Sequence, residues 1–165
     1  MEVPVRRDLR RRPRRGRGHA RPRGLLVSLN IPAPLARDLV DHAERDFPNE
    51  CCGMIGGRDG VAEVVYRATN IEASPFMYVI DPREQLRIMD EIDDAGLDLL
   101  AIYHSHTRSV AYPSRTDVEL AFFPQVHYLI ISLAERETPD LRAFRIARTT
   151  PPEDGITEVP VVVND

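Results

Sequence analysis

Two histidines and one aspartate give this chain a candidate metal-binding set. His104 and His106 follow an apolar run at residues 97–103 that is typical of a buried strand. Because side chains alternate along a strand, both imidazoles should point to the same face, where they can reach one metal ion. Asp117 can complete the set if the loop after His106 folds back. Two imidazoles and one carboxylate leave the fourth position of a tetrahedral zinc ion open to water, which is the catalytic rather than the structural arrangement.

The same stretch also fits a purely structural interpretation. Ser114-x-x-Asp117 stands before an apolar segment that begins at Val118, and this is the pattern of a capping box at a helix start. A His-x-His pair alone is a weak indication of a ligand set, because a histidine at a strand end is usually a hydrogen-bonded polar residue. The two interpretations are compatible, since a capped helix start would fix Asp117 while its carboxylate faces a metal. These fragments alone leave both open.

The spacing of these residues resembles a known signature. His104-x-His106, seven residues, Ser114, two residues and Asp117 resemble the JAMM (MPN+) metallopeptidase signature without insertion or deletion. That family also carries an upstream glutamate just before a short strand, and Glu50 stands in that place here. The resemblance covers essentially the whole chain beyond its N-terminal segment. It implies one zinc ion per chain, held by His104, His106 and Asp117, in a β-barrel-like sheet flanked by helices, the JAMM or cytidine-deaminase-like architecture.

The resemblance also implies roles for the remaining site residues. Zinc lowers the pKa of a bound water to about 7, far below that of bulk water. In the family, the glutamate matching Glu50 contacts this water as general acid and base without binding the metal. The serine matching Ser114 donates a hydrogen bond to the developing oxyanion. Without the resemblance, Glu50 would be a solvated turn carboxylate and Ser114 a helix cap. We expect no catalytic role for Ser105, and we expect Arg108 and Arg115 to face solvent.

Residues around the signature narrow the range of substrates that the resemblance implies. Eukaryotic family members that remove ubiquitin usually carry proline after the second histidine, where this chain has Thr107. The stretches 102–107 and 111–117 look instead like the bacterial Mec-type peptidases. Further matches to that group are Asn70, Ser74, Pro75, Tyr78 and Asp81. Those enzymes cleave cysteine from the C-terminal glycine of a small ubiquitin-like sulfur-carrier protein. The resemblance therefore implies zinc-dependent hydrolysis of that amide in cysteine biosynthesis, with a Gly-Gly-tailed carrier protein as partner.

Other functions remain open at this point. One is a general isopeptidase or deubiquitinase-like JAMM protease, and another is a non-catalytic MPN scaffold, a class that typically lacks several of the metal-site residues present here. A third is nucleic-acid binding through residues 1–24, which hold ten Arg and two acidic residues, a net charge of +8. The remainder holds twelve Arg and twenty-four acidic residues, a net charge of −12, so the chain sums to −4. We expect residues 1–24 to be a disordered, solvated tail without a nucleic-acid partner.

Composition predicts one domain at residues 25–165. A hydrophobic content of 42% in 165 residues is enough for a core, and no apolar run is long enough to cross a membrane. The two cysteines, Cys51 and Cys52, are neighbours that should point to opposite faces of a strand and so are poorly placed to bond each other. We therefore expect reduced thiols in a cytoplasmic protein.

The order of helix and strand patterns predicts an α+β fold with a curved, mainly antiparallel sheet and helices against it. The expected helices are 35–47, 82–95 and 114–123. The expected strands are 25–30, 51–55, 61–68, 76–80, 97–106, 126–133, 141–147 and 156–163.

Overall fold

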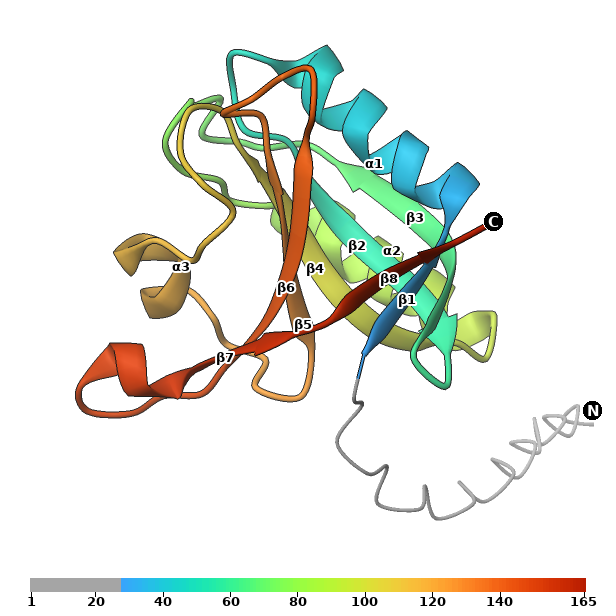
Figure 1. Ribbon diagram of the computed structural model, residues 1–165. Helices are drawn as coiled ribbons and strands as arrows, with labels where there is room; N and C mark the ends of the chain where they lie inside the picture. Colours follow the sequence, from blue (N-terminus) through green and yellow to red (C-terminus); the bar gives the residue numbers. More distant parts are fainter. Residues whose placement is uncertain (1–27) are drawn as a thin grey trace, which may run out of the picture.

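The computed structural model describes residues 28–165 (Figure 1). The predicted tail at 1–24 and the first residues of the predicted strand at 25–30 lie outside the described residues. The α+β class is confirmed. The strands are β1 (Leu29–Pro32), β2 (Cys52–Arg58), β3 (Val61–Ala68), β4 (Asp98–His106), β5 (His127–Ser132), β6 (Asp140–Ile146), β7 (Ile156–Val159) and β8 (Val161–Asn164). The helices are α1 (Ala33–Asp46), α2 (Pro82–Asp94), α3 (Arg115–Glu119) and the short 3-10 helix η1 (Pro152–Gly155).

The sheet curves until its two edges almost meet. Its strands run in the order β7-β6-β5-β4-β2-β3-β1-β8, so the consecutive strands β7 and β8 stand at opposite edges. Only Pro160 separates them, and Figure 1 shows the chain passing from one into the other. Since one residue advances the chain by about 3.8 Å at most, the two edges lie close together. Among the described residues, four strand pairings are antiparallel and three are parallel, so the sheet is more mixed than predicted.

Alternation along the strands divides the core between the two faces of the sheet. Helix α1 covers one face with Leu39, and helix α2 covers the other with Ile88. Cys51 and Cys52 fall in different clusters and are free thiols, as their adjacent positions predict. His104 shares the α2 face, because it lies two residues beyond Ile102 on β4. The candidate site therefore lies on the α2 face of the sheet, where β4 ends.

The predicted strand at residues 76–80 is wrong. This segment forms an isolated bridge between Asn70 and Ile80 rather than a strand. Its backbone bonds to the side chain of Asn70 instead. The Val79 N–H donates to Asn70 Oδ1 at 3.1 Å, and the Met77 carbonyl accepts from Asn70 Nδ2 at 3.1 Å. This side-chain amide, together with the Ile71 N–H that donates to the Val79 carbonyl at 3.0 Å, thus takes the place of a neighbouring strand.

Prolines divide or shorten two other predicted elements. The predicted strand at 156–163 is two strands, β7 and β8, because Pro160 has no N–H to donate to a ladder. The helix predicted at 114–123 ends at Glu119. Pro124 disfavours helical backbone at Phe123 and so argues against the predicted end at 123, but it does not explain the end at Glu119.

Candidate metal centre

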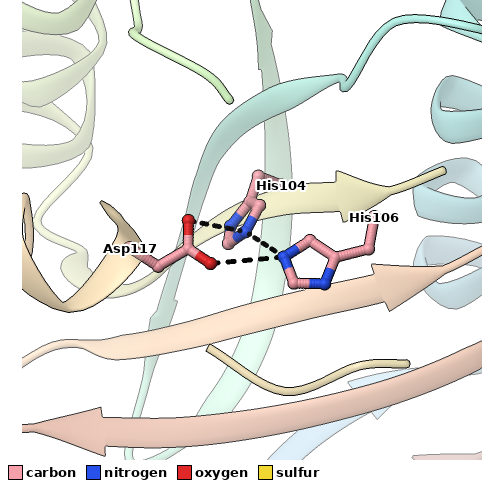
Figure 2. A group of neighbouring side chains, drawn as sticks. All are labelled: His104, His106 and Asp117. Atoms are coloured by element: carbon pink, nitrogen blue, oxygen red, sulfur yellow. Dashed lines mark hydrogen bonds and ion pairs between the residues drawn. The ribbon is translucent and has the colours of Figure 1, made fainter. Parts of the chain in front are cut away.

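Strand β4 brings the two histidines together. It lies between β2 and β5 in the middle of the sheet, so its backbone is held from both sides. His104 and His106 are both buried, and their Nε2 atoms lie 3.1 Å apart. Figure 2 shows both imidazoles turned toward Asp117. The predicted shared face of the two histidines is therefore present.

Helix α3 delivers the carboxylate through a capping box. The Ser114 N–H donates to Asp117 Oδ2 at 2.7 Å, and the Asp117 N–H donates to Ser114 Oγ at 3.1 Å. These reciprocal bonds satisfy two donors at the helix start and fix the Asp117 side chain. From this position, Oδ1 lies 3.2 Å from His104 Nε2 and Oδ2 lies 3.2 Å from His106 Nε2 (Figure 2). The capping box is therefore confirmed, and it is compatible with a carboxylate that faces the two histidines.

The three side chains fit one metal ion. Their ligand atoms all lie within 4.8 Å of one another. Two nitrogens bound to a tetrahedral zinc ion lie about 3.3 Å apart, close to the separation of the two Nε2 atoms. Burial raises the pKa of Asp117, but the two imidazoles and the Ser114 N–H outweigh it and hold that pKa well below its usual range. The carboxylate is therefore ionised, as a metal ligand must be.

Backbone contacts fix the ring of His106. Its Nδ1 lies 2.9 Å from the Val110 carbonyl oxygen and 3.1 Å from Ser109 Oγ. Because a carbonyl oxygen can only accept, Nδ1 carries the proton and donates it to Val110. The lone pair of Nε2 then points toward Asp117 and is free to bind a metal. Such outer partners commonly orient histidine ligands.

Sequence reasoning assigned no site role to two side chains that touch the ligand set. The Tyr78 ring stacks on the His104 imidazole, with centroids 4.3 Å apart and an interplanar angle of 20°. Thr107 Oγ1 donates to the Pro75 carbonyl at 3.1 Å, a bond that proline at position 107 could not make. The two contacts join β4 and the residue after it to the segment at 70–80. Both positions were named from the sequence only through the family resemblance, because contacts formed by long-range packing leave no local pattern.

Glu50 lies beside the ligand set. Cys52 pairs with His104 across β2 and β4, and the Ser105 N–H donates to the Cys51 carbonyl at 3.1 Å, so the same register places Glu50 opposite His106. The Glu50 side chain is buried, and its Oε2 has no hydrogen-bond partner among the described residues. Burial raises the pKa of Glu50 to about 7, with opposing contributions from His106 and Asp117. A carboxylate with this pKa can both accept and release a proton near neutral pH.

Ser114 keeps a free donor at the rim of the site. Its hydroxyl oxygen accepts the Asp117 N–H, and the residue is exposed. A hydroxyl carries one donor in addition to its acceptor lone pairs. The capping bond therefore leaves the hydroxyl proton available to an oxygen of a bound substrate.

The side chains of the other residues considered in the sequence analysis point away from the candidate ligands. Ser105 points to the face opposite the histidines, where its Oγ accepts the Cys51 N–H at 2.8 Å. Arg115 is exposed in an ion pair with Glu119 at 2.9 Å, and Arg108 is also exposed, as predicted. Ser105 therefore links β4 to the backbone next to Glu50 rather than to substrate.

Comparisons with known proteins agree with this geometry. Residues 32–147 match the family described as prokaryotic homologs of the JAB domain. The chain is 41% identical over 143 residues to the CysO-cysteine peptidase of Mycobacterium tuberculosis, covering 86% of this chain and 94% of that protein. It is 37% identical over 118 residues to the desampylase of Haloferax volcanii, covering 67% and 84% of the two chains.

A solved structure shares the fold. The solution structure of a protein from Desulfitobacterium hafniense superposes with a TM-score of 0.73 at 36% identity, covering 82% of this chain and 92% of that one. The family match spans well over half of the chain, and it includes Glu50, the two histidines, Ser114 and Asp117. This chain belongs to the family of prokaryotic homologues of the JAB domain.

Proposed function

We propose that the protein is a zinc-dependent peptidase. It hydrolyses the amide between the C-terminal glycine of a small ubiquitin-like sulfur-carrier protein and an attached cysteine. The observation that carries the proposal is the convergence of His104, His106 and Asp117 beside the buried carboxylate of Glu50. The 41% identity to a CysO-cysteine peptidase supports the choice of substrate.

The donor set suits zinc, a borderline-soft ion that imidazole and carboxylate ligands bind in catalytic sites. When bound, zinc supplies an acidified water and polarises the substrate carbonyl. Glu50 Oε2 accepts the proton of the attacking water, which adds to the glycine carbonyl carbon. The Ser114 hydroxyl donates to the carbonyl oxygen as negative charge develops there.

Glu50 then passes its proton to the leaving nitrogen, and the carbon–nitrogen bond breaks. One water is consumed, the carrier regains a free C-terminal carboxylate, and cysteine leaves as a free amine. Because Glu50 gains one proton and loses one, it ends the cycle in its starting state. Burial of Glu50 disfavours its charged form, which helps it to hold the proton between the two transfers.

Incubation of the zinc-loaded protein with a carrier–cysteine adduct tests the proposal. We expect the carrier mass to fall by one cysteine residue, and a chelator to abolish this change. A carrier extended by serine and one joined to a lysine side chain measure the preference for the leaving group. If the cysteine adduct keeps its mass while a lysine-linked conjugate is cleaved, the isopeptidase alternative replaces the proposal. The 37% identity to a desampylase favours that alternative over the others.

A protein that takes up no zinc and cleaves none of these conjugates would be an MPN scaffold. The presence of all five signature residues argues against this outcome. We also propose that the enzyme works in the cytoplasm, where its two buried free thiols stay reduced. No helix among residues 28–165 is long and apolar enough to span a membrane.

A further inference from the structure

The backbone of Glu50 depends on a segment far away in the sequence. Glu50 lies between α1 and β2, outside any helix or strand. Its N–H donates to the Ser74 carbonyl at 2.9 Å, and its carbonyl accepts from Asn70 Nδ2 at 3.0 Å. Both polar groups of its main chain are therefore held by residues 70–74. Glu50 is not part of a β-strand whose ladder could hold its main chain instead.

Asn70 is the centre of this arrangement. Besides Glu50, its Nδ2 donates to the Met77 carbonyl at 3.1 Å. Its Oδ1 accepts from the Glu72 and Val79 N–H groups, each at 3.1 Å. A side-chain amide offers two donor hydrogens and two acceptor lone pairs, so all of its capacity is used. Together with the Ile71 N–H, which donates to the Val79 carbonyl at 3.0 Å, this side chain folds the segment at 70–80, and it also fastens the segment to Glu50.

The same segment also touches the metal ligands. Tyr78 stacks on His104, and the Pro75 carbonyl accepts from Thr107, the residue after His106. The segment thus spans the gap between the strand that carries the ligands and the loop that carries Glu50. A change in the Asn70 bonds would shift the carboxylate relative to the histidines.

We propose that Asn70 is a positioning residue that holds Glu50 against the metal centre. The catalytic consequence rests on the proposed function, whereas the structural consequence does not. Loss of an outer partner at a metal site commonly reduces activity by about 10–100-fold. A catalytic group also needs to be held by locked neighbours, and Glu50 has no regular secondary structure to supply them.

Amide hydrogen exchange tests the structural part. Asn70→Asp keeps the side-chain shape and both acceptor bonds. It replaces the NH2 group, which donates to the Glu50 and Met77 carbonyls, with an oxygen that cannot donate to them. We expect faster exchange in a peptide covering residues 49–53, with exchange in β4 unchanged. Glu72→Gln is the matched control, because its exposed side chain lies in the same segment and takes no part in these bonds. Unchanged exchange at 49–53 in Asn70→Asp would overturn the proposal.

Kinetics on the carrier–cysteine adduct test the catalytic part. We expect Asn70→Asp and Asn70→Ala to lower kcat by about 10–100-fold, with KM and zinc content close to wild type. In a Glu50→Gln background, the same substitutions should change kcat by less than about threefold, because the group they position is already lost. If the Asn70 substitutions lowered kcat as much in the Glu50→Gln background as in the wild-type background, a role through Glu50 would be contradicted. An effect on KM alone would contradict it as well.

The exchange experiment and the kinetic experiment distinguish a failure of the proposed function from a failure of the positioning role of Asn70. If the wild-type protein cleaves no adduct, the proposed function fails while the exchange experiment still decides the role of Asn70. If Asn70→Ala does not fold, Asn70→Asp carries both measurements. A wild-type enzyme that cleaves the adduct, together with an Asn70→Asp variant of equal kcat, leaves the function intact and overturns the positioning role.

Discussion

At the scale of single residues, two buried carboxylates at one site have pKa values pushed in opposite directions. Burial raises the pKa of Glu50 to about 7, whereas the two imidazoles and the Ser114 N–H lower that of Asp117 in spite of burial. Two titratable groups at one site whose pKa values are pushed apart in this way commonly have different roles in catalysis. The two directions fit the proposed roles, in which Asp117 is an ionised metal ligand and Glu50 exchanges protons.

Glu50→Gln should separate metal binding from catalysis. The amide keeps the shape of the side chain but cannot accept the proton of water, so we expect kcat to fall by about 10²–10⁴-fold. Zinc content should match wild type, since Glu50 is not among the ligand atoms. The measurements are adduct cleavage followed by mass and zinc by elemental analysis. Glu137→Gln, on an exposed turn, is the control. Near-normal turnover in Glu50→Gln would remove Glu50 from the mechanism.

The convergence of the three candidate ligands could be predicted from the sequence because their types and spacing are local signals. His104 and His106 follow from strand alternation, and the Ser114–Asp117 pair follows from the capping box. The role of Asn70 could not be predicted in this way. Its partner Glu50 is twenty residues away, and only the folded chain brings the two together.

At the scale of elements, α3 has two functions with only five residues. Its capping box starts the helix and holds Asp117 at the two histidines. The Ser114 hydroxyl contributes to the cap through its oxygen and to the proposed chemistry through its proton. Substitutions at this one position can separate the two contributions, because a glycine at a helix start costs far less than alanine.

Ser114→Gly should keep the helix start and remove the hydroxyl donor. We expect a loss of only a few tenths of a kcal/mol in the free energy of unfolding, against roughly 1 kcal/mol for Ser114→Ala. Both variants should lower kcat by a similar factor, of the order of 10²–10³, if the hydroxyl stabilises the oxyanion. Urea unfolding and adduct cleavage give the two quantities. A Ser114→Gly variant with wild-type kcat would leave Ser114 as a cap alone.

Elements built on local patterns were predicted well, and those shaped by tertiary context were not. The alternation and apolar runs of β3, β4 and β5 predicted their positions to within one or two residues. Residues 76–80 have the composition of a strand, but the Asn70 side chain takes up their backbone groups. The break at Pro160 was readable in the sequence, yet the parallel pairing of β8 with β1 depends on how the whole sheet closes.

At the scale of the whole molecule, the closed sheet buries a histidine that has no chemical role at the site. His127 begins β5 and is almost fully buried, and neither ring nitrogen has a hydrogen-bond partner among the described residues. Burial and the charge of Arg145 lower its pKa to about 4. The fold therefore holds His127 in its neutral form near neutral pH.

This burial predicts a loss of stability in acid. The folded pKa of His127 lies below the unfolded value near 6.5, so the unfolded chain binds the proton first and stability falls as the pH drops from about 6.5 to about 4. At pH 5 the loss relative to pH 7 should be about 2 kcal/mol. His127→Phe should lack this contribution, since an apolar ring carries no proton. Urea unfolding of both metal-free proteins at pH 5 and 7 measures the difference, and equal pH dependence would contradict it.

The claim that His104, His106 and Asp117 hold one hydrolytic zinc ion is tested most directly by native mass spectrometry of the zinc-loaded protein. Wild type and the exposed control Asp90→Asn should each bind one zinc ion per chain. Asp117→Asn keeps the side-chain shape and an oxygen for the cap, but it should weaken zinc binding beyond the roughly 10–100-fold loss typical of outer-shell partners. A wild-type protein that takes up no zinc, or an Asp117→Asn variant that binds zinc as tightly as wild type, would contradict the metal centre described above.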